Sequence, residues 1–254
     1  ALSQAGRTVL ITGGSGGIGY GIALAFAAAG ADRVIIVGRD EARQQAAAAS
    51  LAAEAGPGSH TKFEGRAASP GSPEDVESLW NALVTEGVLV DVLVLNAAMT
   101  GDALESSLWA RGWESTWEQF IVHKYLVNVA TSAIHDWPAG VATKAYGLTK
   151  NSGVLLLQQL ARDTPVSKMQ IVSFHPGAIL TPAAKSTGAT ERTLDWDNVS
   201  LPSSVAIWAA SDEAAFLHGR FIWSAWDVEE LQSGPLRERI EQDEQYLRIG
   251  VHGV

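Results

Sequence analysis

The sequence predicts an α/β fold, a doubly wound parallel sheet in a three-layer α/β/α sandwich, formed by one domain over residues 1–254. Two observations predict it. Apolar, β-branched runs alternate with Ala- and Leu-rich helical segments, and a glycine cluster joins the first run to the first helix. Repeated strand–helix–strand order favours parallel strands, because each helix returns the chain to the same edge of the sheet. No repeat or linker marks a second domain.

Short runs rich in Val and Ile predict the strands. The run VLVDVLVL at 88–95 is strongly apolar, as expected for a strand that is covered on both faces, whereas 60–64 is the weakest candidate. The predicted strands are Arg7–Thr12, Arg33–Val37, His60–Glu64, Val88–Leu95, Tyr125–Val129, Met169–Phe174 and Arg220–Ala225.

Start and stop residues delimit the helices between these strands. Gly30 ends the first helix, and Gly-Pro-Gly at 56–58 ends the second. At 72–75 the sequence Ser-Pro-Glu-Asp begins the third, with proline in the first turn and acids at the positive end of the dipole. The predicted helices are Ile18–Ala29, Glu41–Ala55, Ser72–Glu86, Ala145–Arg162 and Pro202–Ala210.

Composition excludes several classes of function. The formal net charge of −10 argues against broad nucleic-acid binding, which needs clustered Lys and Arg. The absence of cysteine excludes disulfides and thiolate chemistry, and the six histidines show no metal-ligand spacing. The first residues lack the order of a signal peptide, and no apolar run approaches the roughly 18 residues of a membrane span. We therefore expect a cytoplasmic protein without a metal, a membrane or a nucleic-acid partner.

The sequence TGGSGGIG at 12–19 predicts a phosphate-binding loop. It lies between a predicted strand and a predicted helix, where free N–H groups and the helix dipole favour an anion. Gly13 supplies the tight turn, Gly17 lets the backbone approach a pyrophosphate, and Gly19 lets the helix pack against the strand. The alternative is a flexible Gly/Ser loop. The predicted contacts to a dinucleotide here are Gly13, Ser15, Gly17, Ile18 and Gly19.

The end of the second strand predicts which dinucleotide binds. Gly38 occupies the place where an acid would bind the adenosine ribose and favour NADH. Arg39 follows and can pair with a 2′-phosphate. Asp40 has a competing interpretation as the cap of the next helix. We expect NADPH to be preferred over NADH.

A Tyr-x-x-x-Lys motif, Tyr146 to Lys150, opens a predicted helix, and a spacing of four places both side chains on one helical face. Together with the glycine loop, it resembles the short-chain dehydrogenase/reductase family. The sequences LNAA at 95–98 and HPG at 175–177 resemble further elements of that family, in the same order. The resemblance covers nearly the whole chain, and the segment 214–228 resembles an uncharacterised fungal branch.

The resemblance implies a Rossmann-like fold and a nicotinamide cofactor. The further cofactor-binding residues that it implies are Asn96, Ala97, Tyr146, Lys150, Pro176, Gly177, Ile179 and Thr181. By the same resemblance Tyr146 is the general acid in reduction, and Lys150 favours its phenolate and binds the nicotinamide ribose. A free phenol has a pKa of about 10, too high for efficient acid–base work at neutral pH without such help.

The family also uses a hydroxyl after the fifth strand to polarise the substrate carbonyl. Strand register selects Thr131, whereas the usual spacing to the tyrosine lies slightly nearer Ser132. We prefer Thr131 narrowly, and either hydroxyl has the alternative role of ending the strand.

Three features depart from the family pattern. Ala98 replaces a glycine, and Arg66-Ala67 stand near the place of an Asp that holds adenine. Only the 27 residues 98–124 separate the fourth and fifth strands, where the family has a longer helix with a proton-relay Asn and a dimer surface. The segment 113–123 resembles that helix's first half, and His123 falls near the relay position. Either the helix is truncated, or residues are missing between His123 and Lys124.

The sequence therefore predicts an NADP-dependent oxidoreductase. It would reduce the carbonyl, or oxidise the alcohol, of a small apolar or secondary-metabolite substrate, and would form a homodimer or homotetramer through helices that include 145–162. The alternative is a family-derived protein that binds the cofactor without net redox chemistry, as a cyclase or a sensor.

Overall fold

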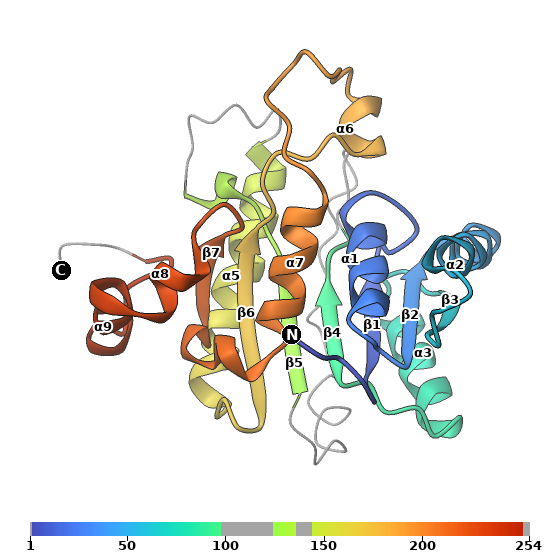
Figure 1. Ribbon diagram of the computed structural model, residues 1–254, viewed down its shortest axis with the longest axis horizontal. Helices are drawn as coiled ribbons and strands as arrows, with labels where there is room; N and C mark the ends of the chain where they lie inside the picture. Colours follow the sequence, from blue (N-terminus) through green and yellow to red (C-terminus); the bar gives the residue numbers. More distant parts are fainter. Residues whose placement is uncertain (1, 98–123, 136–143, 251–254) are drawn as a thin grey trace.

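A computed structural model describes residues 2–97, 124–135 and 144–250. Seven parallel strands form one sheet in the order β3-β2-β1-β4-β5-β6-β7 (Figure 1), which confirms the predicted doubly wound fold. The strands are β1 (Thr8–Thr12), β2 (Arg33–Gly38), β3 (Lys62–Ala67), β4 (Val92–Leu95), β5 (Lys124–Val129), β6 (Met169–His175) and β7 (Arg220–Trp223).

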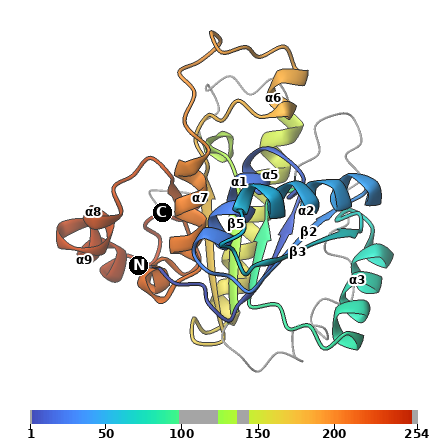
Figure 2. The same ribbon diagram turned by 45° about the vertical axis from the view of Figure 1, so that its right-hand side comes forward.

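Helices cover both faces of the sheet (Figure 1). They are α1 (Gly17–Ala28), α2 (Glu41–Ala55), α3 (Pro73–Thr85), α5 (Lys144–Asp163), α6 (Pro182–Ser186), α7 (Ser200–Ala209), α8 (Val228–Gln232) and α9 (Gly234–Gln242). Two 3₁₀ turns, η1 (Ser132–Ile134) and η2 (Asp212–Leu217), complete the described elements. Figure 2 shows α2 beside β2 and β3, with α3 at the same end of the sheet.

The core has two sides because successive strand residues point to opposite faces. Val9 and Ile11 of β1 face one large cluster, which also holds Phe26 of α1 and Trp208 of α7. Leu10 faces the other side and packs with Leu83 of α3. Leu157 of α5 is buried against Leu126 and Ile171 on that side of β5 and β6. The central strands are thus covered by helices on both faces of the sheet, which explains their apolar sequences.

Three of the predicted strands differ from the structure by more than one residue. β4 begins at Val92, because Val88 instead bonds back to the Leu83 carbonyl and packs in the cluster beneath α3. β3 runs over 62–67, later than predicted. β7 ends at Trp223, because the backbone and hydroxyl of Ser224 both donate to the His175 carbonyl, at 2.9 and 2.8 Å.

The predicted helix at 113–123, the relay position His123 and the substitution at Ala98 lie outside the described residues. In the part of the chain that is described, no helix combines the length and the apolar character needed to cross a bilayer.

Candidate active site at the carboxyl edge of the sheet

The loop between β1 and α1 is shaped by glycines. Gly13 and Gly17 have φ of +69° and +57°, a region that other residues rarely adopt. A Cβ on Gly19 would lie 2.5 Å from both the Asn96 side-chain nitrogen and the Gly13 carbonyl oxygen. No side chain caps α1 at Gly16, which leaves the first N–H groups of the helix available to an anion.

Asn96 joins this loop to the end of β4. Its side-chain nitrogen donates to the carbonyls of Thr12, at 3.0 Å, and Gly13, at 3.2 Å. The backbone N–H groups of Asn96 and Ala97 donate to the Thr12 hydroxyl at 3.0 and 3.1 Å. The structure thus brings together the predicted residues of the first and fourth strand ends.

The segment after β6 reaches the same loop. A Cβ on Gly17 would lie 3.1 Å from the Thr181 methyl group, so these two predicted residues face each other. Gly177 has a φ of +86° and leaves no room for a Cβ beside the carboxylate of Asp197. The Asp197 carboxylate accepts a 2.8 Å hydrogen bond from the Ala178 N–H, and this bond ties the segment after Pro176 to Asp197. Ile179 follows Ala178 in this segment, and its carbonyl accepts a hydrogen bond from the Thr181 N–H.

Two arginines stand near the end of β2. Arg39 is exposed, and Asp40 caps α2 by accepting a 2.9 Å bond from the Arg43 N–H, so the capping interpretation of Asp40 is confirmed. The Arg43 guanidinium lies 3.8 Å from where a Cβ on Gly16 would stand. Sequence reasoning missed Arg43, although its place in the first turn of α2 puts it on the side of the glycine loop.

These features fit a dinucleotide. The glycines leave a cradle that side chains would fill, the uncapped helix start offers N–H donors, and the two arginines suit a phosphate. Arg66 does not stand free for an adenine, because it pairs with Glu64 at 2.9 Å and with Glu86. Within the described ranges, no three His, Asp or Glu side chains gather in a way that would hold a metal ion.

Lys150 is anchored beneath the site. Its ammonium donates a 2.8 Å bond to the carbonyl of Val129, the last residue of β5. Burial lowers the pKa of Lys150 to about 8. Tyr146 opens the same helix, and burial raises the pKa of its phenol above the ordinary value. That Lys150 favours the phenolate of Tyr146, as the family resemblance implies, stays a prediction.

The two candidate hydroxyls after β5 have different environments. Thr131 is 9% exposed, and its oxygen accepts a bond from the Ala133 N–H that caps η1. Ser132 is half-buried, and among the described residues its hydroxyl has no hydrogen-bond partner. α5 packs on this turn, because the Asn151 side chain donates a 2.9 Å bond to the Ile134 carbonyl.

Aromatic rings border the turn on its far side. The ring of Trp223 lies edge-on to His175, with centroids 4.8 Å apart, and 5.8 Å from His135. Trp226 stacks on Trp223 at an interplanar angle of 6°. Burial, together with the nearby His135, lowers the pKa of His175 to about 4, so this imidazole is neutral at physiological pH.

Comparison with known proteins gives this arrangement a family. The short chain dehydrogenase family model matches residues 7–129. A short chain dehydrogenase/reductase of Claviceps purpurea is 35% identical over 97% of this chain and 86% of its own length. The short chain dehydrogenase/reductase AacuD of Aspergillus aculeatus is 33% identical over 97% and 88%.

Solved structures share the fold at lower identity. The NADP complex of Pseudomonas aeruginosa RhlG has a TM-score of 0.71 at 23% identity, covering 87% of this chain and 96% of that one. L-Sorbose reductase of Gluconobacter frateurii, complexed with NADPH and L-sorbose, has a TM-score of 0.71 at 20% identity over 87% and 96%. From its fold, the motifs at its sheet edge and its fungal relatives, the chain belongs to the short-chain dehydrogenase/reductase family of oxidoreductases.

Proposed function

We propose that the protein is an NADPH-dependent reductase of a small apolar carbonyl compound. The observation that carries the proposal is the bond from Lys150 to the Val129 carbonyl. This bond fixes the start of α5 against the end of β5, so Tyr146 and Ser132 come from two elements that meet there. When bound, NADPH supplies the hydride.

The protein's own residues supply the proton and orient the carbonyl. Tyr146 donates its phenolic proton to the carbonyl oxygen, and Ser132 donates a hydrogen bond to the same oxygen. We assign this second role to Ser132 and not to Thr131, because Thr131 is only 9% exposed and its side-chain oxygen accepts the Ala133 N–H, whereas Ser132 is more exposed. The Lys150 ammonium holds the nicotinamide ribose and stabilises the phenolate that remains on Tyr146.

The preference for the 2′-phosphate rests on charge. Asp40 is engaged at the start of α2, Gly38 brings no acid, and Arg39 and Arg43 supply two exposed cations near the glycine loop. Pro176, Gly177 and Thr181 would line the nicotinamide side of the cofactor, and Thr181 also faces Gly17 of the loop.

The apolar character of the substrate rests on the rings beyond Ser132. Trp223 and the neutral His175 form a surface that suits a flat, apolar or aromatic molecule, since such rings gain from offset or edge-to-face contact.

The test follows NADPH absorbance with a panel of aromatic and aliphatic ketones. We expect stoichiometric oxidation of NADPH with at least one aromatic ketone, and a loss of turnover of roughly 10²-fold or more in Tyr146→Phe. NADPH binding should remain in that variant, because the ring is kept. Parent-like turnover by Tyr146→Phe would remove Tyr146 from the mechanism.

One observation favours the second candidate, a cofactor-binding protein without net redox chemistry. Burial raises the pKa of the Tyr146 phenol above its ordinary value, which works against proton transfer at neutral pH. Tight NADPH binding with no NADPH oxidation by any ketone of the panel would support this candidate over the reductase.

A further inference from the structure

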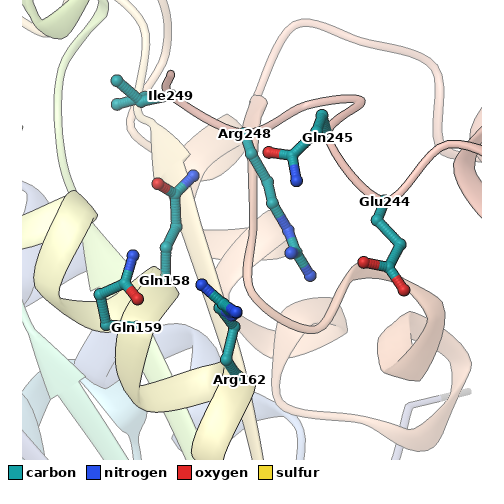
Figure 3. A pocket seen from close by; sticks show the side chains of 7 residues that line it. All are labelled: Gln158, Gln159, Arg162, Glu244, Gln245, Arg248 and Ile249. Atoms are coloured by element: carbon teal, nitrogen blue, oxygen red, sulfur yellow. The ribbon is translucent and has the colours of Figure 1, made fainter. Parts of the chain in front are cut away.

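A cavity separate from the catalytic pair lies between α5 and the segment that follows α9. Its volume is about 160 Å³, and Figure 3 shows side chains entering from both sides. It is lined by Gln158, Gln159 and Arg162 of α5 and by Glu244, Gln245 and Arg248. At a rise of about 1.5 Å per residue, Arg162 lies roughly 18 Å beyond Lys150 along the helix, so this cavity is not part of the proposed active site.

Positive charge outweighs negative charge at this cavity, because two arginines, Arg162 and Arg248, line it beside one carboxylate, Glu244. None of the ion pairs within the described residues involves Arg162, Arg220 or Arg248, although the chain as a whole has a net charge of −10. Burial first, and then the charge of Arg248, lower the pKa of Arg220, although the nearby carboxylates of Asp243 and Glu244 act in the opposite direction. A Cβ on Gly219 would lie 3.5 Å from a guanidinium nitrogen of Arg248, so this arginine lies directly over the start of β7.

The cavity also contains donors that lack acceptors. Gln158 is 6% exposed, and its side-chain nitrogen has no partner within the described residues. The Arg248 Nε is likewise buried and unpaired there. A buried donor without an acceptor destabilises the protein, so two of them lining one cavity indicate an acceptor that the described residues do not provide. The lining carboxylate, Glu244, joins none of the described ion pairs.

The segment that presents Arg248 is held rigidly. The buried guanidinium of Arg220 donates to the carbonyls of Ile240 and Glu244, at 2.6 and 3.3 Å, and also to that of Tyr246. Leu247 adopts a φ of +62°, and its carbonyl accepts a 2.8 Å bond from the Phe221 N–H. A leucine rarely takes this conformation, so the surrounding bonds fix the backbone that aims Arg248.

We propose that this cavity binds a small, doubly charged oxyanion, a phosphate or a dicarboxylate. Arg162 and Arg248 would pair with its oxygens, and the Gln158 amide would donate a third bond. Guanidinium forks match both oxyanions geometrically, and the two arginines outnumber the single lining carboxylate, so the net positive charge of the cavity favours an anion.

The test measures calorimetric binding of inorganic phosphate, and separately of succinate, to the protein saturated with NADPH. Saturation fills the phosphate-binding parts of the cofactor site. Sodium chloride at equal ionic strength is the matched reference. Arg248→Met and Arg162→Met should each weaken binding at least tenfold, as expected for the loss of a charged hydrogen bond. Arg192→Met, which removes an exposed arginine outside the cavity, should leave binding unchanged.

Binding of either probe that the two cavity variants weaken supports the proposal and identifies phosphate or carboxylate as the preferred group. The proposal is overturned if neither probe binds saturably, or if both cavity variants bind like the parent. Arg162 is exposed, so Arg162→Met should fold even if Arg248→Met does not. The same titrations in an Arg39→Ala/Arg43→Ala background without NADPH keep this test independent of the proposed cofactor preference.

Discussion

The proposed cofactor side and substrate side of the candidate active site are built by different means. On the cofactor side, from β1 to β4, the site is made of backbone: glycines with positive φ, an uncapped helix start and carbonyls that Asn96 holds. On the substrate side, after β5, it is made of side chains: a buried lysine, a phenol, a hydroxyl and aromatic rings. Where the backbone forms the site, an added side chain would collide with neighbouring atoms, so almost no substitution is tolerated. Where side chains form the site, its chemistry depends on which side-chain groups are not already engaged in hydrogen bonds.

The largest effect expected from this contrast concerns Ser132 and Thr131. Ser132→Ala should lower kcat by about 10²-fold, the typical result of removing a donor to a developing oxyanion. Thr131→Val should lower stability instead, because it removes the cap of η1, and should leave kcat within a few-fold of the parent. Steady-state kinetics and urea unfolding of both variants measure these two effects. A larger loss of kcat in Thr131→Val would return the role to Thr131.

The buried ammonium of Lys150 predicts a pH-dependent stability. The pKa is about 8 in the folded protein against 10.5 ordinarily, so between these pH values the unfolded chain binds more protons. The free energy of unfolding contributed by Lys150 should therefore rise with pH across this window, by up to about 3 kcal/mol.

Lys150→Met is the reference, because it keeps an unbranched buried side chain without the charge. Urea unfolding without cofactor at pH 8 and pH 10.5 should show the parent gaining stability relative to Lys150→Met at the higher pH. Other titrating groups cancel in this difference. Equal changes in both proteins would mean that Lys150 keeps its ordinary pKa.

On the backbone side, Gly19→Ala tests how closely α1 meets the loop. The added methyl group would lie 2.5 Å from the Asn96 nitrogen and the Gly13 carbonyl. We expect a loss of about 1–3 kcal/mol in the free energy of unfolding, as for other overpacked sites. Gly58→Ala is the matched control, since nothing lies within 4 Å of a Cβ there. Equal unfolding midpoints for the two variants would show that the loop can relax.

The same division explains what the sequence could predict. Periodicity and glycine spacing predict the sheet, α1 and the loop, because φ and close approach depend on residue type alone. Thr131 and Ser132 could not be ranked in this way, because motif spacing does not show which of the two hydroxyls caps η1. Arg43 was missed for a related reason: the charge reaches the glycine loop from a neighbouring helix, and no motif spacing links the two. Boundaries such as Val92 depended on packing against α3.

The smallest expected effect is the cofactor preference, where the backbone site meets side chains. Arg39 and Arg43 are both exposed, so water screens their attraction to a 2′-phosphate, and each should contribute a modest part. Arg43→Ala and Arg39→Ala should each reduce the ratio of NADPH to NADH affinity by about threefold to tenfold, and the double variant should bring it near unity.

Fluorescence titration with both cofactors measures this ratio. Because NADH lacks the phosphate, its affinity should barely change, which separates a lost contact from a damaged loop. If Arg43→Ala leaves the affinity ratio unchanged while Arg39→Ala brings it to unity, the selectivity comes from Arg39, the residue that the sequence predicts. The Arg43 guanidinium beside Gly16 would then contact the loop without binding the 2′-phosphate.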